Sequence, residues 1–157
     1  SCLSWFSSDS MAEVKRVSRD ALLPYSAAQM YAIVNDVESY PRFLPWCSGA
    51  SILDQRENQM TARVEVEKGG LRQSFTTRND LVENQSIQLN LVDGPFSRLR
   101  GRWRFQDLGS DGCKVSLDLS FSFRSRLVAS TFGAIFSVAA SQMVYAFCKR
   151  ADVVYGR

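Results

Sequence analysis

The chain has 157 residues, of which 45% are hydrophobic and 22% charged, and its net charge is +3. This length suits one domain with its own core, and no apolar run reaches the roughly 20 residues that a membrane-spanning helix needs. The sequence contains no histidine, which excludes Ser-His-Asp and Cys-His catalytic sites and the usual zinc ligands. We therefore expect neither a metal site nor a histidine-based enzyme.

The opening segment "SCLSWFSSDS", residues 1–10, has no basic region and no long apolar stretch, so it is not a signal peptide. We expect a disordered extension outside the fold, with a functional arm as the alternative, and a single domain over residues 11–157. The cysteines are far apart and form no CxxC pair. They are typical of reduced thiols in a cytoplasmic protein, not of a disulfide framework. These cysteines are Cys2, Cys47, Cys113 and Cys148.

Residues 13–23 alternate loosely in polarity and predict a strand, which Pro24 ends. Ser26 can cap a helix whose apolar positions recur every three or four residues. A second short helix is expected around Val37 to Leu44, inside the stretch "NDVESYPRFLPWC". Two prolines make this connection stiff and bent, yet it carries several apolar side chains that a surface loop does not need.

From Ser51 the hydrophobic period changes to two, which predicts a run of strands. The segment "QMTARVEVEKGG" alternates strictly, and its Gly69-Gly70 pair is a hairpin signal. "LRQSFTTRNDLV", "SIQLNLVDG", "SRLRGRWRF" and "CKVSLDLSFSF" follow, separated by short turns. Six such strands predict an antiparallel meander, with the first strand of the chain added at one edge.

After Arg126 the apolar residues recur at helical spacing nearly to the end of the chain. About 28 residues predict one helix about 40 Å long. Its apolar face needs an equally apolar partner, and the concave face of a curved sheet is the only candidate. The positions that define this face are Val128, Phe132, Ile135, Ala139, Met143, Phe147 and Val154.

This order of elements is that of the helix-grip fold, and several stretches make the resemblance specific. They are "LLPYSAAQMYAIVNDVESYPRFLPWC", "FTTRNDL", "LNLVDGPFSRLRGRWRF" and "FGAIFSVAASQMVYAFCKRADVVY". Over residues 12–155 the chain resembles the coenzyme Q-binding, START-like family of polyketide cyclases and dehydrases. The resemblance implies an α+β protein in which a curved antiparallel sheet of about seven strands wraps around a long C-terminal helix. Two short helices follow the first strand.

The resemblance also implies two roles, neither of which follows from composition or spacing. One is a cavity that binds a hydrophobic, ubiquinone-like molecule, with no other cofactor. The other is binding to the large ribosomal subunit, which hinders its joining with the small subunit. Trp46 departs from the small residue expected there and would narrow the mouth of the cavity.

The apolar residues of the proline-rich stretch are interpreted as a lid over the cavity, with a simple plug at one end of the core as the alternative. On the strand over residues 71–82, the polar Gln73, Thr77 and Asn79 share the inward phase with Phe75. Such groups need one another, bound water or the polar end of a ligand. The candidate cavity residues are Tyr40, Phe43, Leu44, Trp46, Gln73, Phe75, Thr77, Asn79, Leu91, Trp103, Phe132, Phe136, Ala139 and Met143.

The outward phase of "SRLRGRWRF" holds an arginine at every second position, over about 20 Å of strand. We call Arg98, Arg100, Arg102 and Arg104 the arginine row. A row of like charges suits a phosphate backbone, whose neutralisation releases counterions. An ordinary charged surface is the alternative, and the resemblance to a ribosome-binding protein favours ribosomal RNA.

The sequence therefore predicts a non-enzymatic protein with two function classes open. It either docks on the large ribosomal subunit and inhibits translation, or it carries a ubiquinone-like lipid. An enzyme of the cyclase kind ranks third, because no inward carboxylate could act as a base. The oligomeric state does not follow from the sequence.

Overall fold

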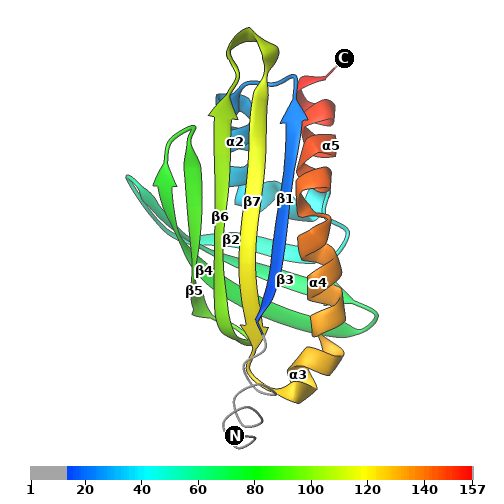
Figure 1. Cartoon of the computed structure of the whole chain (residues 1–157). Helices are drawn as coiled ribbons and strands as arrows, with labels where there is room; N and C mark the ends of the chain where they lie inside the picture. Colours follow the sequence, from blue (N-terminus) through cyan, green and yellow to red (C-terminus); the bar gives the residue numbers. More distant parts are fainter. Residues whose placement is uncertain (1–13, 157) are drawn as a thin grey trace, which may run out of the picture.

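The computed structural model describes residues 14–156. The interpretation of residues 1–10 as an extension lies outside this range. The fold is α+β: a seven-stranded antiparallel sheet in the order β1-β7-β6-β5-β4-β3-β2 curves around the helices (Figure 1). The predicted meander of six strands and the placement of the first strand at one edge are both confirmed, and the structure shows that this edge is the one beside β7.

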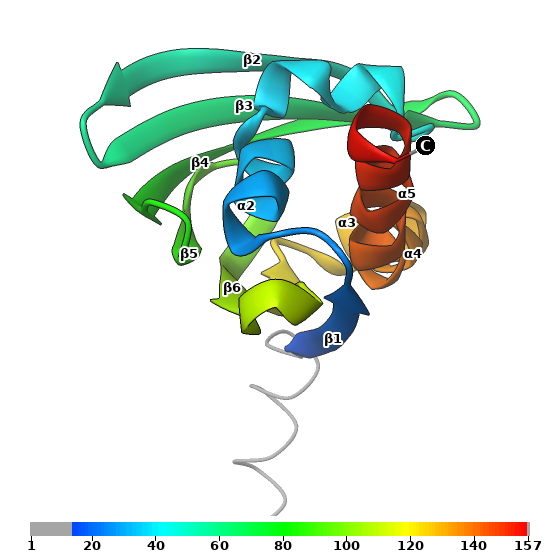
Figure 2. The same cartoon turned by 90° about the horizontal axis from the view of Figure 1, so that it is seen from above.

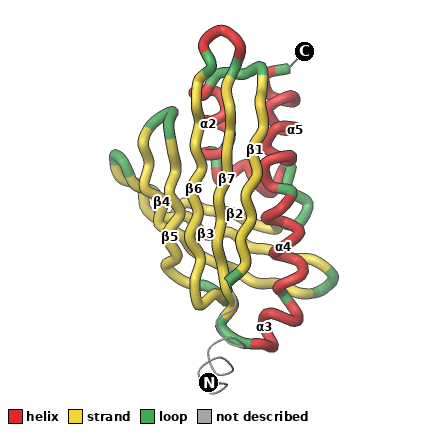
Figure 3. Tube along the Cα trace, viewed as in Figure 1, coloured by secondary structure: helices red, strands yellow, loops and turns green. Residues whose placement is uncertain are grey.

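The elements follow the predicted order, and short loops at the two ends of the sheet join the strands (Figure 3). The strands are β1 (Lys15–Leu23), β2 (Cys47–Arg56), β3 (Gln59–Lys68), β4 (Leu71–Val82), β5 (Ser86–Asp93), β6 (Phe96–Asp107) and β7 (Cys113–Phe123). The helical elements are α2 (Ala27–Asn35), η1 (Val37–Arg42), η2 (Gly109–Asp111), α3 (Arg126–Thr131), α4 (Gly133–Ser141) and α5 (Met143–Tyr155).

Helix α2 begins where the sequence predicts, because Ser26 caps it. The Ser26 hydroxyl accepts a hydrogen bond from the Gln29 backbone, and the Gln29 side chain accepts one from the Ser26 backbone, which completes a capping box. The second short helix is a 3-10 helix, with Pro41 inside it. Proline has no backbone N–H to donate, so a regular α-helix cannot continue through this position.

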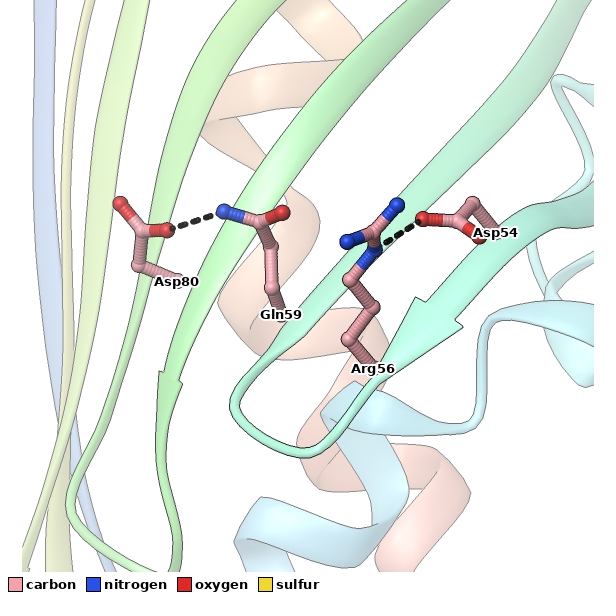
Figure 4. Close-up of polar contacts among 4 residues, drawn as sticks. All are labelled: Asp54, Arg56, Gln59 and Asp80. Atoms are coloured by element: carbon pink, nitrogen blue, oxygen red, sulfur yellow. Dashed lines mark hydrogen bonds and ion pairs between the residues drawn. The ribbon is translucent and has the colours of Figure 1, made fainter.

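Local turn chemistry fixes the register of the meander. Gly69 and Gly70 both have positive φ at the β3–β4 turn, and Asn84 adopts φ 63° at the β4–β5 turn. The β2–β3 hairpin carries polar contacts close to its tip: Arg56 is 3.1 Å from Asp54, and Gln59 donates to Asp80 of β4 (Figure 4). The Gln59–Asp80 contact adds to the backbone pairing of β3 with β4, whereas the Arg56–Asp54 pair lies within β2.

The prediction of one long C-terminal helix is wrong in detail, because α3, α4 and α5 follow one another as three segments. Phe132 and Gln142 separate them, with ψ angles of −24° and 2°. Backbone hydrogen bonds from Phe136 to Phe132 and from Ala146 to Gln142 carry the helical path across both breaks. Figure 2 shows these segments on the concave side of the sheet. A bent rod follows a curved sheet more closely than a straight one can.

Aromatic rings fill the core at the α3–α4 end of the sheet. Phe136 of α4 lies with its ring centroid 4.8 Å from those of Phe96 and Phe121. Gly133 begins α4 beside the Phe123 ring, where an added Cβ would lie 3.3 Å from that ring. The core is therefore solid at this end, which confines free space to the middle of the sheet and to the η1 end.

Candidate functional site

An internal cavity of about 80 Å³ lies between the sheet and the C-terminal helices. Its wall is largely apolar, with Thr77 and Asn79 as the polar side chains of the sheet. Side chains from η1, from five strands and from α4 and α5 form it, together with Trp46. The lining residues are Val37, Tyr40, Trp46, Ala62, Val64, Phe75, Thr77, Asn79, Leu89, Leu99, Trp103, Leu119, Phe136, Ala139, Met143 and Phe147.

The structure brings together most of the residues that the sequence singled out for a cavity. Those that line it are Tyr40, Trp46, Phe75, Thr77, Asn79, Trp103, Phe136, Ala139 and Met143. Five others lie elsewhere. Leu44 and Phe132 are buried core residues, and Phe43 borders a surface hollow. Leu91 and Gln73 are half-buried, and Gln73 lies near the start of β4, away from Thr77 and Asn79. Inward phase alone does not separate the cavity wall from the core.

Seven lining residues were not among the candidates: Val37, Ala62, Val64, Leu89, Leu99, Leu119 and Phe147. Leu89, Leu99 and Leu119 share the inward phase of their strands, a pattern that core residues show as well. Leu89 and Leu119 flank Gly101 of β6 in register. A Cβ at Gly101 would lie 2.7 Å from Leu119 Cδ1, so the missing side chain gives room to both leucines.

The proline-rich stretch serves partly as a plug and partly as a wall of the cavity. Leu44 is fully buried, and the Phe43 ring packs 5.4 Å from that of Phe147. Tyr40 donates a hydrogen bond to the Val34 carbonyl and packs its ring 5.2 Å from Phe147. Tyr40 and Trp46 nevertheless reach the cavity. The apolar side chains thus close one end of the core while two of them border the empty space.

The polar spot of the cavity is a hydrogen-bonded pair on β4. The Thr77 hydroxyl donates to Asn79 Oδ1 over 2.8 Å, and both side chains are buried. Of the three inward polar residues, these two satisfy each other in part. The amide hydrogens of Asn79 are further donors, which a ligand carbonyl or a water could accept.

A double-mutant cycle tests this pair. Thr77→Val alone should lower the free energy of unfolding by about 1–3 kcal/mol, because it leaves a buried Asn79 oxygen without its donor. The double variant Thr77→Val/Asn79→Leu should lose less than the sum of the two single changes, since both polar groups are gone. Urea unfolding measures all four proteins. Additive losses would show that the two side chains are not coupled.

On the opposite face of the sheet the arginine row is exposed at all four positions. Its cross-strand neighbours are mostly neutral: Arg100 pairs with Ser120 of β7 and Asn90 of β5, and Arg104 pairs with Ser116 and Ser86. Arg102 donates to Gln88 over 2.7 Å. Within residues 14–156 the ion pairs are Arg56–Asp54 and Arg72–Glu67, so no member of the row is in one.

The same face also carries carboxylates and further cations: Asp20 of β1 and Asp80 of β4 lie two strands from the row, in the same outward phase as Lys114 of β7. Asp118 of β7 lies opposite Arg102 and accepts a hydrogen bond of 2.7 Å from Ser18 of β1. Arg16 of β1 borders the same surface hollow as Arg100 and Arg102, which has a volume of about 440 Å³. Sequence reasoning missed Arg16, because only the strand order brings β1 to within two strands of β6.

Two buried thiols titrate far from neutral pH. Burial raises the pKa of Cys47 to about 11, and the negative charge of Glu65 acts in the same direction. Burial also raises the pKa of Cys113 to about 11, with a smaller contribution from Asp107. Cys47, Cys113 and Cys148 are free thiols. At pH 7 the first two are protonated and buried, and therefore poor nucleophiles.

These shifts predict a loss of stability in alkali. The folded state holds both thiol protons more tightly than the unfolded chain, whose thiols have a pKa of about 8.5. The contribution to stability is therefore complete below about pH 8.5 and declines as the pH rises towards 11. Urea unfolding across this range should show a smaller alkaline decline in Cys47→Ala/Cys113→Ala than in the wild type. Equal declines would assign the effect to other groups.

The described part of the chain contains no group of three or more His, Cys, Asp and Glu side chains that could hold a metal ion. Among residues 14–156, no helix combines the length and apolarity needed to cross a membrane.

Residues 23–148 match the family described as polyketide cyclase / dehydrase and lipid transport. The ribosome association toxin RatA of Escherichia coli (strain K12) is 51% identical over 140 residues, which are 89% of this chain and 89% of that protein. The mitochondrial coenzyme Q-binding protein COQ10 homolog B of Xenopus laevis is 31% identical over 144 residues, 89% of this chain and 59% of that protein.

Among solved structures, the Zhui aromatase/cyclase from Streptomyces sp. R1128 superimposes with a TM-score of 0.78 at 17% identity. The match covers 89% of this chain and 94% of that one, and it shows a shared fold. The family match and the level of identity lead to one assignment. The chain belongs to the START-like polyketide cyclase/dehydrase and lipid transport family and, within it, to the RatA family.

Proposed function

We propose that this protein binds the large ribosomal subunit through RNA phosphates and hinders subunit joining, without catalysing a reaction. The observation that carries the proposal is the arginine row, four exposed guanidinium groups on one strand with mostly neutral neighbours. Guanidinium groups form bidentate hydrogen bonds with phosphate, and an extended sheet face suits the shape of an RNA backbone. A relative at 51% identity is named for ribosome association. A protein that binds the large ribosomal subunit works in the cytoplasm, which is the location that this proposal implies.

The arrangement of charge on this face favours RNA binding over an ordinary charged surface that mobile counterions neutralise. A solvated sheet face usually mixes signs, but here Asp118 is the carboxylate in register beside the row, and Ser18 already occupies one of its oxygens. Arg16 adds a cation two strands from the row, and the carboxylates Asp20 and Asp80 are also two strands away, with Asp80 accepting a hydrogen bond from Asn90. No exposed aromatic side chain interrupts the row on β6, so contact with phosphate and sugar, not base stacking, is the expected mode.

Order of addition tests the proposal. Purified protein is mixed with isolated large subunits before small subunits are added, and sucrose-gradient profiles are recorded. We expect the protein to sediment with the large subunit and the peak of joined ribosomes to fall. Protein added after joining should have a smaller effect. Failure to sediment with the large subunit, or equal effects in both orders, would contradict the proposal.

A second candidate function, binding of a ubiquinone-like lipid, rests on the apolar cavity and its Thr77–Asn79 pair. The size of the cavity limits it, because small-molecule sites usually have volumes of about 300–1,000 Å³. At about 80 Å³ the cavity would have to open before a quinone ring could enter. Native mass spectrometry of protein purified from cells would detect a bound lipid, and its absence would remove this candidate.

The proposal excludes a cyclase-like reaction for a reason within the cavity. Among the residues that line the cavity, Tyr40 carries the titratable side chain. Its hydroxyl already donates a hydrogen bond to the Val34 carbonyl. Burial raises the pKa of this phenol far above its ordinary value, so it is no base near neutral pH. General acid–base catalysis needs a group that titrates near the working pH.

A further inference from the structure

A stripe of exposed apolar side chains runs along the outer surface of α4 and α5. Val138, Tyr145 and Val153 are separated by seven and eight residues, so they lie on one side of the helical path. Their exposed fractions are 51%, 67% and 74%. Single exposed apolar residues need no explanation, but an aligned set beside an apolar hollow points to a contact surface.

Two hollows of about 480 Å³ each flank Trp46 next to this stripe. One lies between η1 and α5, with Phe43, Tyr145 and Val153 in its wall. The other lies between the β3–β4 turn and α4, with Val138 in its wall. Trp46 and Pro45 belong to both.

Basic side chains surround the stripe. Arg42, Lys149 and Arg150 line the first hollow, whose wall contains no carboxylate. Lys68 lines the second, where the one carboxylate, Glu67, is paired with Arg72 at 3.0 Å. The Arg150 guanidinium lies 5.0 Å from the Phe43 ring centroid, and the Lys149 ammonium lies 5.8 Å from that of Tyr145. Cations are thus held against aromatic faces at the surface.

The same region borders the internal cavity. Trp46 lines the cavity and both hollows, and Ala139 lines the cavity and the second hollow. An anionic bilayer supplies both phosphate groups for the cations and an apolar layer for Val153, Tyr145 and Trp46. Tryptophan and tyrosine favour that boundary because their rings are apolar and carry one polar group.

We propose that this face, defined by Arg42, Trp46, Tyr145, Lys149, Arg150 and Val153, docks on the surface of an anionic lipid bilayer. The basic groups contact lipid phosphates, and the apolar stripe enters the headgroup layer. The inference goes beyond ribosome binding and does not depend on it, because the arginine row lies on the convex face of the sheet.

Vesicle co-sedimentation of the full chain tests the inference, with phosphatidylglycerol/phosphatidylcholine vesicles compared with pure phosphatidylcholine. We expect binding to the anionic vesicles alone, weakening with salt. Each basic residue near such a surface contributes about a fivefold gain in binding. Lys149→Glu/Arg150→Glu should therefore lower binding at least 25-fold. The matched control, Arg100→Glu/Arg102→Glu, reverses as many charges on the sheet and should lose much less.

Two further measurements keep the test independent of folding and of net charge. Val153→Asp changes an exposed apolar residue and should weaken vesicle binding while thermal unfolding stays unchanged. The tryptophan fluorescence of the wild type should shift to the blue on the anionic vesicles, and Trp46→Phe should lose most of that shift. Equal losses for the two charge-reversal pairs would reduce the effect to net charge and overturn the proposal. Absence of binding to anionic vesicles would also overturn it and leave an acidic protein as the partner for this face.

Discussion

Replacing Arg98, Arg100, Arg102 and Arg104 with glutamine should abolish sedimentation with the large ribosomal subunit while leaving the fold intact. All four side chains are exposed on the convex face, and the lost contact that the structure defines is the Arg102–Gln88 hydrogen bond. Surface changes of this kind alter the free energy of unfolding by about 0.5 kcal/mol or less. Relief of like-charge repulsion acts in the stabilising direction.

The size of the binding loss follows from counterion release. Four phosphate contacts give a salt slope of about −2.8 to −3.6, so a fourfold rise in salt should weaken wild-type binding about 50- to 150-fold. The quadruple variant should show almost no such slope. Single changes should each reduce it by about one, uniformly along the row.

The matched control instead removes four cations from the two hollows beside Trp46, as Arg42→Gln/Lys68→Gln/Lys149→Gln/Arg150→Gln. It has the same net charge as the arginine-row variant, and it should still sediment with the large subunit. Equal losses in both would show that net charge governs binding. Retained sedimentation of the arginine-row variant would remove the row from the mechanism and leave the loops or helices as the contact surface.

The sequence predicted those features of the fold that depend on local pattern. Ser26 and Gln29 form a capping box from residues three apart, and Gly69-Gly70 supplies the positive φ that its turn requires. The arginine row needed only a period of two, because alternate residues of a strand face one side. Strand order followed from short loops between antiparallel neighbours.

Features that depend on packing between distant residues could not be predicted. Arg16 joins the arginine face only because β1 lies beside β7, which no local pattern encodes. Phe43 looked like a cavity residue, yet it packs between Phe147 and the Arg150 guanidinium at the surface. The cavity volume is the small difference between two large volumes, the space enclosed by sheet and helices and the side chains that fill it. The alternation of inward residues therefore predicted where the cavity lies but not how large it is.

The second large effect concerns that empty volume. Ala139 of α4 is 2% exposed and lines the cavity, whereas its neighbour Ala140 is fully buried in the core and does not. Ala139→Leu adds an isopropyl group that can enter the space, and should be neutral or stabilising by up to about 0.8 kcal/mol per methylene buried. Ala140→Leu, the matched control, should cost about 1–3 kcal/mol through overpacking.

Ala139→Trp extends the series beyond the available space. An indole is larger than the cavity of about 80 Å³, so it must displace Met143 or Trp46. We therefore expect the free energy of unfolding to fall by about 1–3 kcal/mol. Urea unfolding gives the stabilities, and titration with a short-chain quinone gives the binding. Both Ala139 variants should bind the quinone less tightly than the wild type, and both should sediment with the large subunit unchanged. If Ala139→Leu costs as much as Ala140→Leu, the space is not available to a ligand, and lipid binding loses the observation on which it rests.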